Sequence, residues 1–239
     1  LAREGRKLRR LSLPRLQYVP RGHHPGTALC TDSNAYFRVA GVGSYQQPAK
    51  LARNNRRLGK KLAERHGTVA LAVEPSNFRN LGRFFEIEAS GWKGAGGTAI
   101  EQQDELGRAY ISACRHEDSV SRGCVFTLYA ASVPISAAFG LVYPGHVTLL
   151  KIAFDDRFGE FSPGSLLISE ILDHCKAEDK AKLYLSTFPD WSHRWKPEAV
   201  DKFSVRLYAD SAAGRIKLTL DALCDRVARL FRGLLSRLK

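Results

Sequence analysis

The sequence predicts a mixed α/β fold, of the α+β mixed-sheet kind, in which an antiparallel meander leads into a strand–turn–helix–strand unit. The apolar period changes from 3.6 to 2 near residue 125, which indicates that helices give way to strands. Short turns separate the strand-like segments that follow, and this is typical of antiparallel neighbours. The last of them leads through a helix into another strand, which requires a parallel crossover.

Two helices with a short strand between them are expected in the first half of the chain. Residues 48–65 carry apolar side chains at helical spacing on one face and Arg or Lys over most of the rest. A strand candidate follows at 68–73, and Ser76 can cap a second helix that ends near residue 90. The side chains expected to face inward are Leu51, Leu58 and Leu62, then Phe78, Leu81, Phe84 or Phe85, and Ile87. A third helix is expected over 101–120.

The second half of the chain supplies most of the sheet. The strand candidates of the meander are 125–133, 135–143 and 147–154, with turns at Pro134 and at 144–146. A loop at 155–164, a helix at 163–178 and a strand at 183–187 form the crossover unit.

These segments divide the chain into three parts. Residues 1–45 are expected to be irregular and are interpreted as the remnant of an upstream domain; 46–213 form the α/β domain, and 214–239 form an amphipathic helix. The five cysteines lack zinc-ligand spacing, which favours buried, reduced thiols. No apolar run approaches the length of a membrane span, so we expect a cytoplasmic protein.

A net charge of +13 makes polyanions natural partners of this chain. Charge alone does not choose among nucleic acid, an anionic membrane and acidic polysaccharide. The basic helix at 48–65 is the segment that we expect to contact tRNA or an anionic membrane. The alternative is a solvated helix face.

The segment 151–165 has the features of a phosphate-binding helix start. Ser162 is a favourable N-cap residue, and Pro163 suits the first helical position. Gly164 and Ser165 then place small side chains where free main-chain N–H groups and the positive end of the helix dipole attract a phosphate. The alternative is an ordinary capped helix without a ligand.

Several short motifs together resemble one branch of the GNAT acyltransferases. They are Phe-Glu-Ile-Glu-Ala-Ser-Gly-Trp-Lys-Gly at 85–94, Gly-Thr-Ala at 97–99, Lys-Ile-Ala-Phe-Asp at 151–155, Ser-Pro-Gly at 162–164 and His-Arg-Trp at 193–195. The pattern resembles the GNAT-like acyltransferases of the cellulose and exopolysaccharide (CelD-like) group, related to Fem-type aminoacyl transferases. It covers residues 46–210. The usual phosphate loop has a second glycine, which is missing here, so acyl-CoA use is implied by the fold alone.

The resemblance implies an N-acyltransferase that moves an acyl group from acetyl-CoA or another acyl-CoA to an amine, such as a sugar or polysaccharide precursor. In GNAT enzymes the pantetheine arm runs beside the fourth strand, here 147–154, and a main-chain N–H stabilises the oxyanion. The residues implied to bind this co-substrate are Lys151, Ile152, Ala153, Gly159, Ser162, Pro163, Gly164 and Ser165.

A general base must take a proton from the amine. Asp155, at the end of the strand, is the first candidate and Glu88 the second. Asp155 is alternatively a solvated carboxylate or a partner of Arg157. Trp92 and Lys93 follow a helix end and are expected to line the acceptor groove, with a structural Trp as the alternative.

Further aromatic residues have two interpretations each. Trp191, Trp195 and Arg194 either hold an acceptor by stacking and charge or pack at the surface. Tyr184 is either an acid for the leaving thiolate or a core residue of its strand. The histidines lack metal-ligand spacing, so we expect no catalytic metal.

Three functions therefore compete: transfer from acyl-CoA, Fem-like transfer from aminoacyl-tRNA, and a non-catalytic module that binds nucleic acid or an anionic membrane. The terminal helix is expected to dock on its own domain or on the second subunit of a homo-oligomer. The acyl group and the acceptor are not specified by the sequence.

Overall fold

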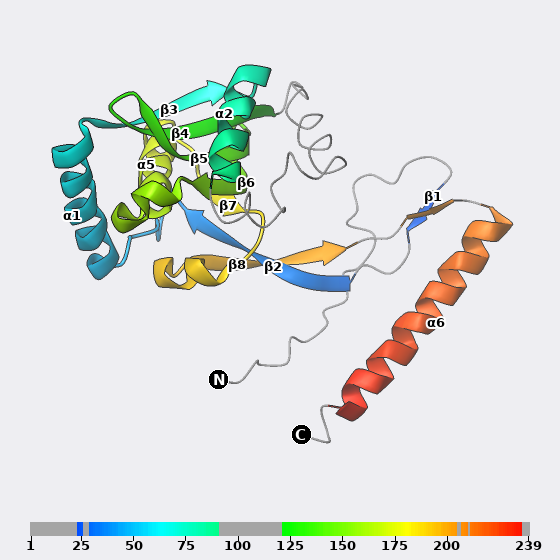
Figure 1. The fold of residues 1–239 in the computed structure, drawn as a ribbon. Coiled ribbons are helices and arrows are strands. Elements are labelled where there is room, and N and C mark those ends of the chain that lie inside the picture. The colour runs from blue at the N-terminus through cyan, green and yellow to red at the C-terminus, as the bar shows by residue number, and fades with distance from the viewer. Residues whose placement is uncertain (1–22, 26–28, 91–120, 205–206, 210, 236–239) are drawn as a thin grey trace. The chain divides into compact units, whose positions relative to one another are not determined.

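The computed structural model describes residues 23–25, 29–90, 121–204, 207–209 and 211–235. Its contacts divide the chain into two compact units. Asn34–Val200 form the larger unit, and Leu1–Ser33 with Asp201–Lys239 form the smaller one. The elements of both units are labelled in Figure 1, and each unit is described by itself.

A mixed seven-stranded sheet, ordered β3-β4-β5-β6-β7-β2-β8, forms the centre of the larger unit. Its strands are β3 (Val69–Pro75), β4 (Arg122–Ala130), β5 (Val133–Val142), β6 (His146–Phe154), β7 (Lys182–Leu185), β2 (Leu29–Arg38) and β8 (Glu198–Ser204). Neighbours from β3 to β6 run antiparallel, β6 and β7 run parallel, and β7 and β2 run antiparallel. The predicted mixed α/β fold, with its meander and its parallel crossover, is confirmed.

Two predictions about the strands are wrong. Residues 1–45 are not irregular throughout, because β2 alternates buried Ala35 and Phe37 with the more exposed Tyr36. The turn predicted at Pro134 lies earlier, at Ala131, whose φ is 51°. Pro134 lies within β5 where the register with β4 shifts, a position that tolerates the missing N–H.

Three predicted helices are present: α1 (Ala49–His66), α2 (Phe78–Ala89) and α5 (Pro163–Ala177). The start of α2 differs from the prediction, because the side chain of Asn77, not of Ser76, accepts the N–H of Asn80 and caps the helix. Phe78 is then the first helical residue and is 83% exposed instead of facing inward. The helix predicted at 101–120 lies outside the described residues.

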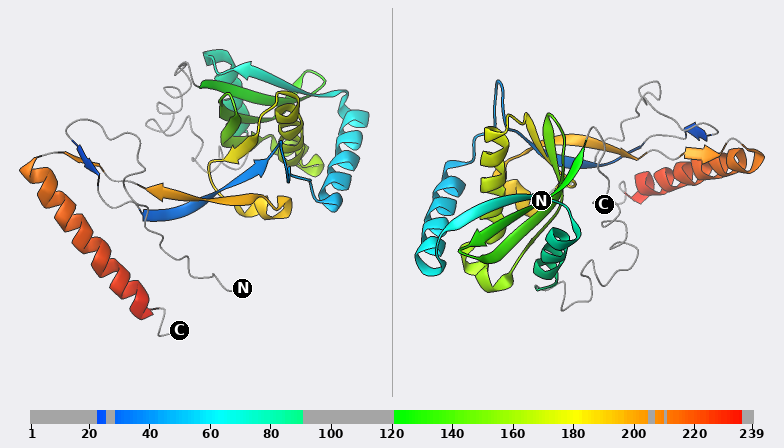
Figure 2. Two further views of the ribbon diagram at one scale, coloured as in Figure 1. Left: turned by 180° about the vertical axis from the view of Figure 1, so that it is seen from behind. Right: turned by 90° about the horizontal axis from the view of Figure 1, so that it is seen from above.

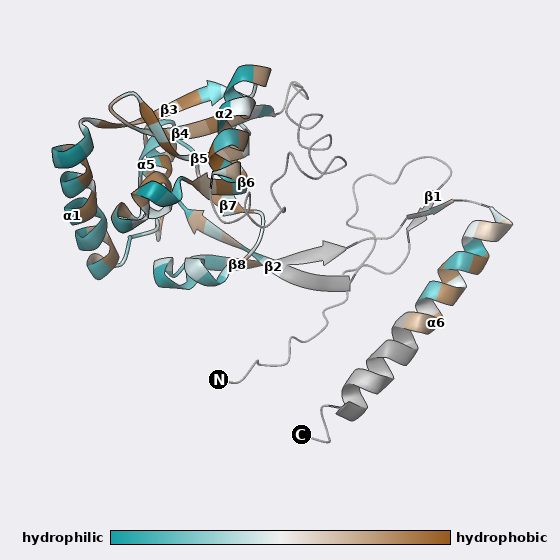
Figure 3. Ribbon diagram, viewed as in Figure 1, coloured by the Kyte–Doolittle hydropathy of each residue, from teal (hydrophilic) through white to brown (hydrophobic). Residues whose placement is uncertain are grey.

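Helices cover both faces of the sheet (Figure 2). On one face α5 packs against β3 to β7, and α1 packs against α5; on the other face α2 packs against β4, β5 and β6. Side chains of β4 alternate between the two layers, with Phe126 in the α5 cluster and Val125 in the α2 cluster. In Figure 3 the ribbon of α1 is mostly coloured hydrophilic, whereas strands of the sheet contain many residues coloured hydrophobic. A ligand of β6 must therefore approach along an edge of that strand.

The smaller unit contains β1 (His23–Pro25), β9 (Leu207–Ala209) and α6 (Ala212–Leu235). β1 pairs antiparallel with β9, and the hydroxyl of Tyr208 donates to Asp221 of α6 at 2.8 Å. The predicted C-terminal helix is confirmed by α6. None of the helices in the described part of the chain has the length and apolarity needed to cross a lipid bilayer.

Candidate active site

Strand β6 has partners on both sides for only part of its length. β5 pairs with it from residue 147 to residue 154, but β7 pairs with it only over 146–149. Just beyond, Ser186 donates its N–H to the carbonyl of Leu149 and its hydroxyl to the carbonyl of Leu150, both at 3.0 Å. Residues 151–154 have no strand partner on this side among the described residues. β6 and β7 therefore separate there.

The main chain of Ile152 and Phe154 faces this open edge. The N–H of Asp155 donates to the carbonyl of Ile135 at 2.9 Å, so residue 155 faces β5. Residues of an antiparallel strand alternate in the edge that they face. Ala153 therefore also faces β5, and its neighbours face the open edge. The register with β5 shifts at Leu150, and this bulge sets the alternation.

In the turn before α5, most main-chain N–H groups donate hydrogen bonds to carbonyls of the same turn. It begins with a short 3-10 helix, η3 (Asp156–Phe161). Ser162 donates its N–H to the carbonyl of Gly159 at 3.0 Å, and Ser165 donates to the carbonyl of Ser162 at 2.9 Å. Pro163 has no N–H. Of residues 162–165, only Gly164 has an N–H that meets no acceptor in the described parts of the chain. The prediction of several free N–H groups here is wrong, because the N–H groups of Ser162 and Ser165 donate to carbonyls within the turn.

Ser162 stands at the predicted N-cap position but does not cap the helix with its side chain. Its φ of 52° and ψ of 55° lie in the left-handed region, and its side chain makes no capping hydrogen bond. This conformation costs a residue other than glycine about 1–2 kcal/mol. The strain is part of the bend that connects η3 to α5.

A cavity of about 330 Å³ lies between the open edge of β6 and the start of α5. Its lining residues are Ile152, Phe154, Gly159, Ser162, Pro163, Gly164, Ser165, Trp191 and Arg194. Six of the eight residues predicted to bind a co-substrate belong to this set. Lys151 and Ala153 do not, because strand alternation directs them to the α2 face, where Ala153 joins the α2 cluster. The sequence reasoning missed Phe154, although its spacing of two from Ile152 is the signal that could have found it.

Arg194 and Trp191 belong to the cavity wall instead of a separate acceptor site. Both lie on η4 (Asp190–Trp195), a second 3-10 helix, which follows β7. Trp191 is 39% exposed. Arg194 is exposed and forms no ion pair with any described residue. Its charge is therefore available to an anion in the cavity.

The Ser165 side chain is bound to α1. Its hydroxyl donates to the side-chain oxygen of Asn55 at 3.0 Å, and the Asn55 amide donates to the hydroxyl of Ser169 at 2.9 Å. Asn55 and Ser165 are both buried. Buried polar groups of this kind are costly to leave unpaired. The network therefore fixes α1 to the first turns of α5 beside the cavity.

Asp155 lies next to the cavity but does not line it. Its carboxylate accepts hydrogen bonds from the guanidinium of Arg157, including contacts of 2.6 and 3.0 Å, and one from the Arg157 N–H at 3.0 Å. These hydrogen bonds hold the pKa of Asp155 below its usual range, against the opposing effect of burial. The arrangement matches the alternative in which Asp155 is a partner of Arg157.

Glu88 lies on the opposite face of β6. It is buried on α2, and its carboxylate is 3.7 Å from the ammonium of Lys151. The strand β6 thus separates Glu88 from the cavity, whose described lining does not include α2. Trp92 and Lys93 lie outside the described residues.

The remaining candidates have structural surroundings. Trp195 is fully buried, and its ring packs against Phe37, so it cannot stack on an acceptor at the surface. Tyr184 lies among the rings of Tyr36 and His146, away from the cavity lining. Burial raises the pKa of the Cys175 thiol to about 12, which suits a structural thiol. In the described parts of the chain, no three His, Cys, Asp or Glu side chains gather into a metal site.

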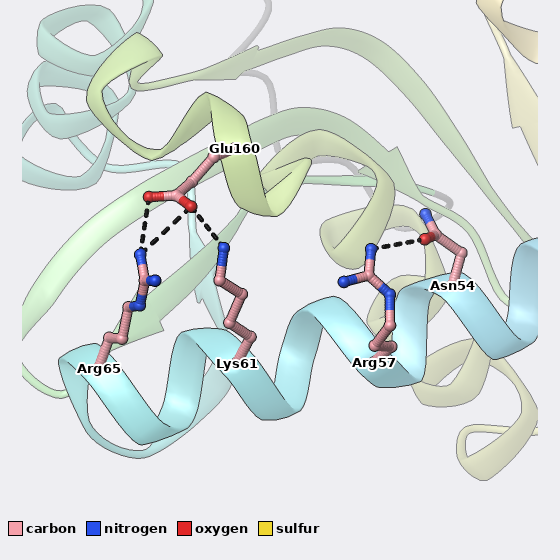
Figure 4. A network of polar contacts seen from close by, with 5 residues as sticks. All are labelled: Asn54, Arg57, Lys61, Arg65 and Glu160. Atoms are coloured by element: carbon pink, nitrogen blue, oxygen red, sulfur yellow. Dashed lines mark hydrogen bonds and ion pairs between the residues drawn. The ribbon is translucent and has the colours of Figure 1, made fainter.

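The outer face of α1 is strongly basic. Glu160 of η3 binds Lys61 and Arg65 at 2.6 and 3.1 Å (Figure 4). The other Arg and Lys side chains of the helix are exposed: Lys50, Arg53, Arg56, Arg57 and Lys60. The first turn of α1 contains no acid, so Lys50 and Arg53 oppose the helix dipole. The outer face of α1 therefore has a large excess of positive charge.

The sequence matches the profile of the acetyltransferase (GNAT) domain family over residues 49–196, which is more than half of the chain. The chain belongs to the GNAT acetyltransferase-domain family. The matched span begins at α1 and ends just after η4, so it contains the open edge of β6, the start of α5 and the cavity.

Several solved structures are similar to this chain at low sequence identity. The C-terminal domain of a putative lysylphosphatidylglycerol synthetase from Agrobacterium fabrum is 11% identical, with a TM-score of 0.50, over 84% of this chain and 66% of that chain. FemX is 12% identical, with a TM-score of 0.45, over 72% and 60%. A tandem GNAT protein from the clavulanic acid biosynthesis pathway is 10% identical, with a TM-score of 0.41, over 85% and 63%. This chain thus spans less than two thirds of each of them. No curated protein matches the sequence.

Proposed function

We propose that the protein is an N-acyltransferase that takes an acyl group from a pantetheine thioester, such as acetyl-CoA or another acyl-CoA, and transfers it to an amine. The observation that carries the proposal is the open edge of β6 beside a cavity that ends at the free N–H of Gly164. The pantetheine arm extends along residues 152–154, and its phosphate meets the start of α5. The resemblance to the CelD-like group suggests a cytoplasmic enzyme with a sugar or polysaccharide precursor as acceptor.

In this mechanism the amine approaches through the gap between β6 and β7 from the α2 face. Its nitrogen attacks the thioester carbonyl while the N–H of Ile152 donates to the oxyanion. The carbon–sulfur bond then breaks, the amine loses a proton to a base, and the thiolate leaves. Glu88 is the candidate base on that face, since both oxygens of Asp155 are held by Arg157.

Glu88→Gln tests the assignment of the base. We expect kcat to fall by about 10²–10⁴ while the Kd for acetyl-CoA is unchanged, because the change removes the proton acceptor and keeps the size of the side chain. Thermal unfolding measures separately the effect of losing the charge contact with Lys151. Glu86→Gln is the matched control on the exposed side of the same helix. Equal activity of both variants would exclude Glu88 as the base.

Binding and transfer test the function itself. Calorimetry should detect acetyl-CoA and CoA, and a mass-shift screen of acyl donors against amine acceptors should find an acylated product. An absence of binding and of product with every pantetheine donor would refute the proposal.

The basic outer face of α1 favours a second candidate, Fem-like transfer from aminoacyl-tRNA. Five exposed cations and the fixed contact of α1 with α5 would bring a polyanion to the cavity. A tRNA complex whose affinity falls steeply with salt, and that weakens in Arg53→Gln with Arg57→Gln, would support this candidate.

A further inference from the structure

The cavity has two groups that can hold phosphate oxygens. The first is the N–H of Gly164, since the neighbouring N–H groups of Ser162 and Ser165 are bound to carbonyls within the chain. The second is the guanidinium of Arg194 in the cavity wall. A guanidinium binds the two free oxygens of a phosphate well, and a helix N–H adds one more hydrogen bond.

The other cations near the start of α5 are paired with acids. Arg157 is bound to Asp155, with its closest contact at 2.6 Å. Lys61 and Arg65 share Glu160, as Figure 4 shows. Releasing any of them would leave a carboxylate beside the incoming anion. Arg194 is therefore the cation of the cavity that a phosphate can engage without displacing an acid among the described residues.

A diphosphate needs more positive charge and more hydrogen-bond donors than these groups supply. It has two negative charges and four non-bridging oxygens, whereas the described lining residues offer one free cation and, at the start of α5, one free N–H; the N–H groups of Ile152 and Phe154 lie along the strand edge assigned to the pantetheine arm and the oxyanion. The volume of about 330 Å³ also lies at the lower end of the range for ligand pockets, about 300–1,000 Å³. The wall contains Ile152, Phe154 and Trp191, which suit a narrow, partly apolar arm.

We propose that the protein holds a single phosphate of its donor, the one that ends the pantetheine arm, and takes little affinity from the second phosphate and adenosine of CoA. This inference rests on the proposed function. The donor class is then the thioesters of 4′-phosphopantetheine, whether that phosphate is a free monoester or a diester on a larger carrier.

Three donors with the same acyl group test the proposal: acyl-pantetheine, acyl-4′-phosphopantetheine and acyl-CoA. The first phosphate should raise kcat/KM about ten- to a hundredfold, as expected for charge-assisted hydrogen bonds. The remainder of CoA should change it by less than about threefold. A tenfold or larger gain from phosphopantetheine to CoA, or no gain from the first phosphate, would overturn the inference. No transfer from any of the three donors would instead refute the proposed function.

Two variants locate the effect in the cavity. Arg194→Gln removes the free cation, and Gly164→Asp adds a negative charge that the helix dipole tolerates. Both should remove most of the advantage of phosphopantetheine over pantetheine; the quantity compared is the ratio of kcat/KM for the two donors within each variant, so that a general loss of activity cancels. Arg56→Gln is the matched control, an exposed cation on the outer face of α1. Loss of the phosphate effect in Arg56→Gln, or its survival in both cavity variants, would contradict the assignment.

Discussion

The two halves of β6 lie in one strand but have opposite roles. Residues 147–149 are paired on both edges, and Val147 and Leu149 are buried in the α5 cluster. Residues 151–154 are paired on one edge only, and Phe154 is 40% exposed. The difference teaches that the same backbone hydrogen-bonding groups stabilise the sheet where they have partners and can bind a ligand where they have none.

The comparison is tested most strongly by placing proline in each half. The carbonyl of Leu149 binds Ser186, so the N–H of the same residue also faces β7, and Leu149→Pro removes a ladder position and a buried side chain. Together these losses cost more than about 5 kcal/mol, enough to unfold many domains. Ile152→Pro removes no ladder hydrogen bond and should cost about 1–2 kcal/mol. Circular dichroism and thermal unfolding measure both, and unfolding of the two variants alike would remove the distinction.

The open half should instead respond in catalysis. Ile152→Pro deletes the N–H assigned to the oxyanion, and kcat should fall by about 10²–10³, the usual effect of losing one such donor. Ile152→Val keeps the N–H and should retain activity within about threefold. Steady-state kinetics with acetyl-CoA decides this, and equal activity of the two variants would exclude the Ile152 N–H from the reaction.

The residue that ends the open half should affect stability and its dependence on pH. Asp155→Asn should lower the free energy of unfolding by about 1–2 kcal/mol, a modest value because Arg157 is 79% exposed. Since folding depresses the pKa of Asp155, its contribution is complete above the unfolded pKa of about 4 and is lost as pH falls through the lower folded value. Urea unfolding between pH 6 and about 2 should therefore show a smaller acid loss in the variant. Identical acid profiles would contradict the role of this pair.

The smallest effect is expected at the strained turn after η3. Ser162→Gly relieves a left-handed conformation at the cost of added freedom in the unfolded chain, so stability should rise by up to about 1 kcal/mol. Ser162→Ala keeps the strain and removes no capping hydrogen bond, so it should be nearly neutral. Thermal unfolding compares the two, and a larger change in Ser162→Ala would assign a structural role to the hydroxyl.

Periodicity predicted the elements because it records which side chains are buried. The change of period near residue 125 and the short turns identified the meander, and Pro163 identified the start of α5. Periodicity did not identify β2, because its pairing with β7 joins residues about 150 positions apart. It also could not assign the N–H groups of the α5 turn, since the 3-10 hydrogen bonds of Ser162 and Ser165 depend on backbone angles.

The site was predicted in part for the same reason. Small residues near a helix start are visible in sequence, and Gly159, Ser162 and Gly164 do line the cavity. The position of Arg194 depends on η4, which follows β7 and forms part of the cavity wall. The carboxylate of Asp155 has the chemistry of a general base, which the sequence shows. Its hydrogen bonds with Arg157 depend on side-chain conformation, which the sequence does not show.

The bulge at Leu150 inserts one residue into β6 and thereby chooses the cavity wall. Because of the bulge, Leu149 and Lys151 face opposite layers although they lie two residues apart: Leu149 is in the α5 cluster, whereas Lys151 pairs with Phe139 of the α2 cluster. Strict alternation from Leu149 would instead place Lys151 and Ala153 on the α5 face, where Ile152 and Phe154 stand now, and an ammonium group would replace an apolar wall. A single inserted residue thus decides whether this strand presents hydrocarbon or charge to whatever lies alongside it.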